Sequence, residues 1–104
     1  MEAEVTVSQE EYEELFYESE SVQLFPDSVT WVKTQVISKV PDKHIGLIEL
    51  RGALGESGIL LVNSIVALGK EGAIHLTLVN PFRNRVFDLI KGQLLGRLYY
   101  VKVK

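Results

Sequence analysis

The side chains most often used for chemistry in enzymes are sparse in this chain, and their spacing matches no catalytic or metal-binding pattern. There is no cysteine among the 104 residues, which excludes thiol catalysis and thiolate metal sites. The two histidines, His44 and His75, lack the spacing of a metal-binding pair, so we interpret both as structural or surface residues. We therefore expect neither a metal ion nor another cofactor.

The carboxylates beyond the first 28 residues are too scattered for paired acid and base catalysis, because they fall one per segment. They are Asp42, Glu49, Glu56, Glu71 and Asp88. Glu49 and Glu56 flank the turn that begins at Arg51, and a salt bridge within this turn is the favoured use of these charges. From spacing alone, no residue is assigned a catalytic role.

Charge divides the sequence into an acidic N-terminal segment and a basic body. Residues 1–28 contain nine Asp or Glu and no Lys or Arg, whereas residues 29–104 contain five acidic and eleven basic residues. The acidic segment either forms an exposed, solvated leader, folds against the basic body, or presents an acidic face to a basic partner. Nucleic-acid binding is not expected, because no cluster of Lys and Arg is interleaved with aromatic residues.

The elements that must position these side chains begin with a short predicted helix within residues 1–20 of the acidic segment. Ser8 and Glu11 have the spacing of a capping box, which favours a short helix over residues 9–18. Tyr12, Leu15 and Phe16 would then form one apolar stripe, and so short a helix must pack on another surface.

The rest of the chain predicts an all-β fold. About seven short runs rich in leucine and β-branched residues are separated by glycine, proline and aspartate at turn positions. No helical pattern separates these runs, which argues against a mixed α/β fold. We assign residues 1–104 to a single β domain, a sandwich or barrel. Its last strand, around Tyr99 and Tyr100, alternates in polarity and leaves an edge to be covered.

The N-terminal sequence lacks the basic and apolar regions of a secretory signal. No apolar run approaches the roughly 18 residues that are needed to span a bilayer. We expect an intracellular protein, cytoplasmic or nuclear, without membrane insertion.

Five short motifs follow one another in order between residues 20 and 103. They are PDKHIG (41–46), RGAL (51–54) with a later Gly-Ile pair, SIVALGKEG (64–72), Asn80, and GQLLGRL (92–98). This series resembles the motifs of the trimeric dUTPase family. The resemblance implies a dUTPase-like jelly roll or β-barrel and a homotrimer.

The resemblance also implies that the family's chemistry is lost. Ala67 stands where the family has its water-activating aspartate, and Lys70 stands where it has its sugar-stacking tyrosine. An alanine methyl group cannot accept a proton, so general-base catalysis is not expected. Arg51 is the substrate-contacting side chain that remains. The implied nucleotide pocket is therefore vestigial, and its residues are Arg51, Asn63, Ser64, Ala67 and Lys70.

This pattern implies a catalytically inactive dUTPase-like protein that acts as a protein-interaction or regulatory module. The Gly96-Arg97 pair in the last motif is similar to the adenoviral early-region-4 first-reading-frame proteins, which implies a viral protein acting in a host cell. Its partner would be a host or cellular protein that the sequence does not identify. Two alternatives remain open, namely a nucleotide-binding protein that sequesters without hydrolysis, and residual dUTP pyrophosphatase activity.

Five aromatic or aliphatic residues are candidates for contact with such a partner. They are Tyr12, Leu15 and Phe16 of the acidic segment, and Tyr99 and Tyr100 near the C-terminus. The alternative for these side chains is packing in the core or in the trimer.

Overall fold

Strands dominate the fold. The computed structural model describes residues 5–41, 43–66 and 71–103, and the part of the chain that it describes contains nine strands and one short helix. All of the strand pairs in this part are antiparallel. The prediction of an all-β fold is confirmed.

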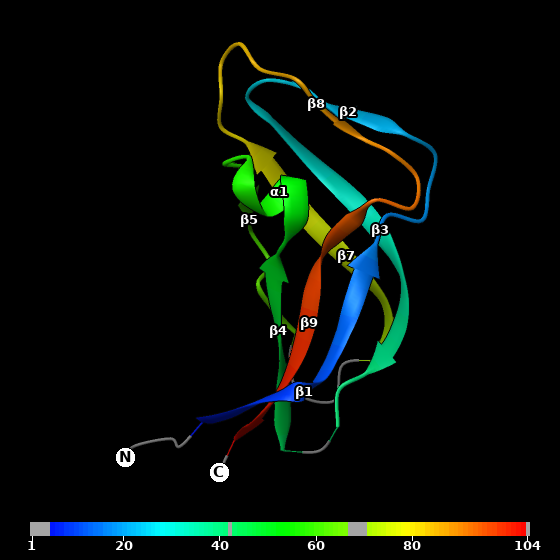
Figure 1. The fold of residues 1–104 in the computed structure, drawn as a ribbon, viewed down its shortest axis with the longest axis vertical. Helices are drawn as coiled ribbons and strands as arrows, with labels where there is room; N and C mark the ends of the chain where they lie inside the picture. Colours follow the sequence, from blue (N-terminus) through cyan, green and yellow to red (C-terminus); the bar gives the residue numbers. More distant parts are fainter. Residues whose placement is uncertain (1–4, 42, 67–70, 104) are drawn as a thin grey trace.

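The strands form two larger sheets, with a small two-stranded sheet at one end of the molecule (Figure 1). The first sheet contains, in spatial order, β1 (Val5–Phe16), β9 (Leu94–Val103), β4 (His44–Leu50) and β6 (Ile65–Val66). The second contains β3 (Ser28–Lys39), β7 (Glu71–Asn80) and β5 (Leu60–Leu61). The small sheet pairs β2 (Val22–Leu24) with β8 (Phe87–Leu89), and the helix α1 (Gly52–Glu56) follows β4.

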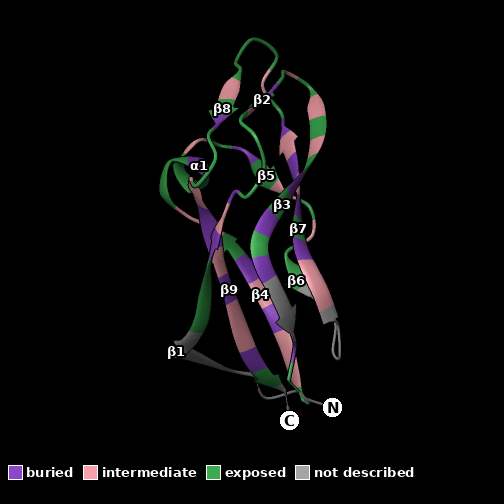
Figure 2. Cartoon of the chain, turned by 90° about the vertical axis from the view of Figure 1, so that its right-hand side faces the viewer, coloured by how far each residue is buried: buried purple, intermediate pink, exposed green. Residues whose placement is uncertain are grey.

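The core lies between the two larger sheets. Alternate residues of each strand point to opposite faces, so every second side chain is directed inward. Figure 2 shows bands of buried residues along β3, β7 and β9, separated by exposed or intermediate residues. The buried side chains of β3 and β7 include Val32, Thr34, Val36, Ile74, Leu76 and Leu78, and they meet Leu15, Ile48, Leu95 and Leu98 from the first sheet. Burial of this apolar surface is the main favourable contribution to folding.

Residues 5–16 form strand β1, so the prediction of an N-terminal helix is wrong. β1 pairs with β9, with Tyr12 opposite Tyr99 and Glu14 opposite Arg97. The Tyr12 and Tyr99 rings lie 5.7 Å apart between centroids, as favourable cross-strand pairs do. A glutamate-rich segment favours a helix locally. This preference is weak, and here it is overridden by the pairing of β1 with β9. The one helix among the described residues is α1.

The acidic N-terminal segment folds against the basic body. Glu14 lies 3.9 Å from Arg97, and Glu18 lies 3.6 Å from Lys33, measured between charged atoms. The side chain of Gln35 in β3 joins the end of β1, where its amide donates to the Glu14 carbonyl and accepts from the Phe16 N–H. Of the three alternatives for this segment, the structure therefore shows the second for residues 5–20.

Candidate functional site

A hollow of about 760 Å³ lies on the outer face of the first sheet. Strands β1, β4 and β9 contribute most of its lining. Arg51, just before α1, and Ser64, between β5 and β6, complete it. Its lining residues are Tyr12, Leu47, Ile48, Glu49, Arg51, Ser64, Arg97 and Tyr99. We call this hollow the arginine pocket.

The strand register arranges these side chains in two rows. One row runs from Tyr12 through Tyr99 to Leu47, and the next runs from Glu14 through Arg97 to Glu49. Residues directly opposite one another in an antiparallel sheet point to the same face, so the rows lie side by side. The pocket thus has an apolar row and a charged row, and the Arg97 guanidinium lies 4.5 Å from the centre of the Tyr12 ring.

The polar groups of the pocket form a continuous chain of contacts. Arg51 donates a hydrogen bond of 2.9 Å to Glu49, and the Tyr99 hydroxyl donates one of 3.4 Å to the same carboxylate oxygen. A hydrogen bond with Tyr99 raises the pKa of the Arg97 guanidinium, and the charge of Glu14 raises this pKa further. Each of the two arginines faces a carboxylate of its own chain.

The backbone holds Arg51 in place at the end of β4. Its N–H donates to the Leu95 carbonyl at 3.0 Å, and its own carbonyl accepts from the Gly55 N–H in α1 at 3.2 Å. The side chain is directed back over the sheet toward Glu49. The salt bridge expected within this turn is therefore present, between Arg51 and Glu49.

The other predicted pocket residues divide into three groups. Ser64 lines the arginine pocket together with Arg51. Asn63 does not line it, because its amide accepts from the Thr77 N–H and donates to the His75 carbonyl, which extends the pairing of β5 with β7. Ala67 and Lys70 lie outside the residues that the structure describes.

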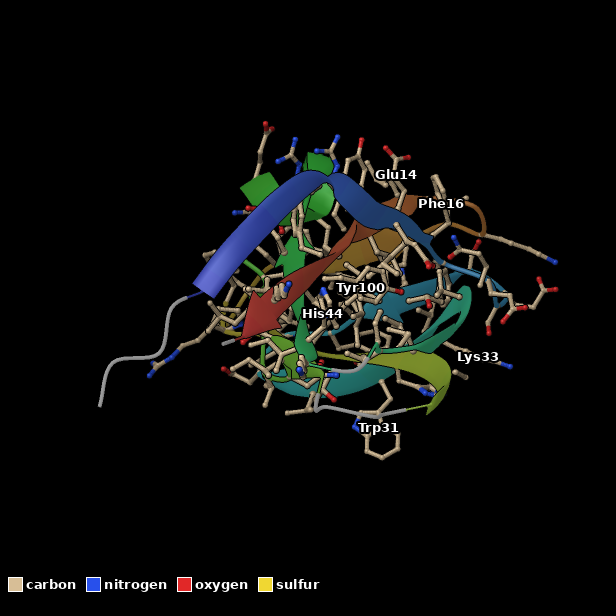
Figure 3. All side chains as sticks on the ribbon, turned by 90° about the horizontal axis from the view of Figure 1, so that it is seen from below. Glu14, Phe16, Trp31, Lys33, His44 and Tyr100 are labelled. Carbon is tan, nitrogen blue, oxygen red and sulfur yellow. The ribbon has the colours of Figure 1, made fainter. Side chains whose placement is uncertain are left out.

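The structure places the five predicted contact residues in different environments. Tyr12 and Tyr99 meet at the arginine pocket, and Phe16 is half-buried. Tyr100 points to the opposite face of β9, where it packs against the core and donates a hydrogen bond to Glu13 (Figure 3). Leu15 is fully buried, so its prediction as a surface contact is wrong. Leu15 follows the outward-facing Glu14 in continuous register with β9, so strand alternation points the leucine inward.

Sequence reasoning missed the roles of Glu14 and Arg97 in the pocket. Glu14 falls in the segment predicted as a helix, which would have placed it far from β9. The signal was the alternation of residues 97–101, since Arg97 and Tyr99 share one face of a strand.

We also searched the described residues for a metal-binding site and a membrane-spanning helix. Residues 5–41, 43–66 and 71–103 contain no group of three or more His, Cys, Asp or Glu side chains that could hold a metal ion. The helix found in these ranges is not long and apolar enough to cross a membrane.

Comparison of the sequence with protein-family models and with curated proteins gives no match. Solved structures do match. The native EIAV dUTPase superimposes with a TM-score of 0.71 at 17% identity, covering 88% of this chain and 87% of that one. The dUTPase of Staphylococcus bacteriophage 80alpha superimposes with a TM-score of 0.75 at 14% identity, covering 99% of this chain and 91% of that one. The chain therefore has the dUTPase-like fold, as the motif series implied.

Proposed function

We propose that this chain is a catalytically inactive dUTPase-like protein that acts as a protein-interaction or regulatory module. The fold supports a relationship to dUTPases, and the sequence carries Ala67 and Lys70 where the family motif has aspartate and tyrosine. Without the aspartate, no side chain of that motif can orient and deprotonate a water molecule.

The observation that carries the proposal is the pairing of both pocket arginines with carboxylates of the same chain. Glu49 contacts Arg51 and Glu14 contacts Arg97, so the charged row and Arg51 together hold two cations and two anions. A triphosphate would have to displace both glutamates, or approach them against Coulomb repulsion. The arginine pocket is therefore poorly suited to hold a nucleotide for hydrolysis.

A regulatory role has a parallel among the structural neighbours. The Staphylococcus bacteriophage 80alpha dUTPase is described as controlling the transfer of virulence genes by a G protein-like mechanism. We propose a comparable role in protein contacts here, with Tyr12, Phe16 and Tyr99 at the contact surface. The last motif favours the viral branch similar to the adenoviral proteins. The chain would then act inside a host cell, as a homotrimer.

The test is pyrophosphate release from dUTP in the presence of magnesium. We expect no release above background from the purified protein, and none from Ala67→Asp, because catalytic groups that act as a unit are strongly non-additive. Magnesium-dependent turnover that is abolished by Arg51→Ala, but kept by Arg83→Ala, would show that the chain is an enzyme. Arg83 is a matched control because it is exposed and lies outside the arginine pocket.

Nucleotide sequestration without hydrolysis is the second candidate, favoured by the presence of Arg51 and Ser64 in one hollow. Calorimetry with deoxynucleotides and signalling nucleotides separates it from the lead proposal. Heat of binding that is lost in Arg51→Ala would favour sequestration. Absence of heat at about 1 mM nucleotide, which corresponds to only about 4 kcal/mol of binding free energy, would exclude it.

A further inference from the structure

The loop between β7 and β8 presents two arginines to solvent. Residues 81–86 form this loop, and Figure 1 shows it at the end of the molecule opposite the start of β1 and the end of β9. Arg83 and Arg85 are both exposed. None of the residues that line the arginine pocket comes from this loop, so the two arginines belong to a separate surface.

Two aromatic rings hold the Arg85 guanidinium in place. Its central carbon lies 4.8 Å from the centre of the Phe82 ring and 4.7 Å from the centre of the Phe87 ring. The two ring centres are 6.0 Å apart and the ring planes are tilted by 46°, so the rings form a notch that receives the guanidinium. A guanidinium that rests on a ring face keeps its N–H groups along its edge, where they can still donate to a ligand.

The loop that carries these rings is fixed by the core. Asn80, which is almost fully buried, accepts from the Phe82 N–H and donates to the Arg85 carbonyl. The Phe82 carbonyl accepts from the Asp27 N–H at 3.2 Å. The Phe82 ring lies directly against Gly58, where an added Cβ atom would come within 2.8 Å of it. Arg85 is therefore positioned before any ligand binds, which lowers the entropic cost of binding.

The loop arginines differ from the arginines of the pocket. Each arginine of the pocket lies beside a glutamate of its own chain. Within the described ranges, by contrast, the guanidinium groups of Arg83 and Arg85 form neither an ion pair nor a hydrogen bond. The next acid along the chain, Asp88, accepts a hydrogen bond from Gln23 instead. Residues 81–87 thus carry two positive charges and no carboxylate.

We propose that Arg85, together with Arg83, binds carboxylates of an acidic peptide segment on a partner protein. The inference rests on the proposed protein-interaction role and names the chemistry of the partner. A planar guanidinium matches a carboxylate in a two-point hydrogen bond. One exposed ion pair contributes little, so a ligand with several carboxylates fits this loop better than a single small anion. Two cations neutralise too few phosphates for stable nucleic-acid binding.

The probe for this site is a fluorescein-labelled, glutamate-rich hexapeptide, compared with the same peptide in which glutamine replaces each glutamate. In about 50 mM NaCl, fluorescence anisotropy should show saturable binding of the glutamate peptide below about 1 mM, and no binding of the glutamine peptide. In two-dimensional NMR spectra of the arginine side chains, the Nε–H signal of Arg85 should shift on binding. Absence of binding by the wild-type protein up to about 2 mM peptide would overturn the proposal.

Two variants and one matched control locate the site. Arg85→Gln should weaken binding about tenfold, because a charge-assisted contact is lost. Arg85→Lys should weaken it about fivefold, because lysine keeps the charge but loses the two-point contact and the planar fit in the notch. Lys91→Gln removes one exposed charge beyond β8 and should bind as wild type. An equal loss in Lys91→Gln, or tighter Arg85-dependent binding of a single-stranded oligonucleotide than of the peptide, would overturn the assignment.

The dUTP assay separates failure of this inference from failure of the proposed function. If the peptide does not bind and dUTP is not hydrolysed, the assignment of this loop is wrong and the proposed function stands. Magnesium-dependent turnover of dUTP would overturn the proposed loss of catalysis, and peptide binding that is lost in Arg85→Gln would support the loop assignment even then.

Discussion

Glu14 and Glu49 set the electrostatic character of the arginine pocket. Each carboxylate lies beside a guanidinium, at 3.9 Å from Arg97 and 2.9 Å from Arg51. Exposed ion pairs of this kind contribute little to stability, typically about 0–1 kcal/mol. Their main effect is on ligand binding, because a guanidinium that is paired with a glutamate binds an anionic ligand less strongly.

We expect the double variant Glu14→Gln/Glu49→Gln to bind inorganic pyrophosphate more tightly than the wild-type protein. Removal of two nearby negative charges should improve affinity roughly thirtyfold at low ionic strength, since each charge contributes about 1 kcal/mol near a solvated surface. Calorimetry measures the change. The double variant Glu20→Gln/Glu56→Gln alters net charge equally away from the pocket, and an equal gain there would attribute the effect to net charge alone.

Asn80 is a polar residue inside the core, and its side chain is only 1% exposed. Its amide donates to the carbonyls of Leu24 and Arg85 and accepts from the Phe82 N–H, at 2.8–3.0 Å. Asn80→Leu would leave these backbone groups unpaired, and we expect it to lower the free energy of unfolding by about 3 kcal/mol. Urea denaturation checks this value. Asn84→Ala, at an exposed position of the same loop, should change stability by less than about 0.5 kcal/mol.

At the level of elements, most strands of the two larger sheets were predictable, but the N-terminal strand β1 was not. Alternation such as that of residues 28–36 is set by one covered face, and it can be recognised within a single segment. β1 depends on a partner about 85 residues away in β9, and its capping box and glutamates favour a helix locally. Tertiary pairing decided that segment, which local preference cannot anticipate.

The same contrast between local and long-range contacts explains which residues of the candidate site could be predicted. The position of Arg51 at the end of a strand followed from its turn, and its bond to Glu49 joins residues two apart. Arg97 and Glu14 meet across 83 residues only because β1 and β9 pair in one register. Asn63 was expected in the pocket, but its amide bonds to β7, a contact that depends on the position of another strand.

The close approach of β9 to β4 makes Gly96 a sensitive position. A Cβ atom at Gly96 would overlap the backbone carbonyl of Glu49. Because the obstacle is backbone, Gly96→Ala should force the two strands apart and destabilise the fold by about 2–3 kcal/mol, the upper part of the range for overpacking. Gly92→Ala meets no atom but takes a φ of +85°, and we expect a smaller loss of about 1 kcal/mol. Equal effects in thermal or urea unfolding would show that backbone conformation, not crowding, dominates at both sites.

At the scale of the whole molecule, the division of charge becomes a contact between two parts of the fold. The first 28 residues carry no basic residue, and the body carries a surplus of six positive charges. The pairing of β1 with β9 and the ion pairs at Glu14 and Glu18 place the negative segment on the positive body. Unlike a uniformly charged surface, this arrangement is stabilised by attraction across the molecule.

Salt should therefore destabilise this protein over a range where it has little effect on many others. Raising NaCl from about 20 mM to about 500 mM shortens the Debye length from about 20 Å to about 4 Å, which screens exposed pairs such as Glu18–Lys33. We expect the free energy of unfolding to fall by about 1 kcal/mol, and the midpoint of thermal unfolding to fall by about 4–8 °C.

Protein concentration must be held constant, because association also shifts the midpoint. The variant Glu14→Gln/Glu18→Gln removes two of the attracting charges and should show about half of this salt dependence. A midpoint that rises steadily with NaCl in the wild-type protein would mean that repulsion within the acidic segment, rather than its attraction to the body, dominates the electrostatics of the fold.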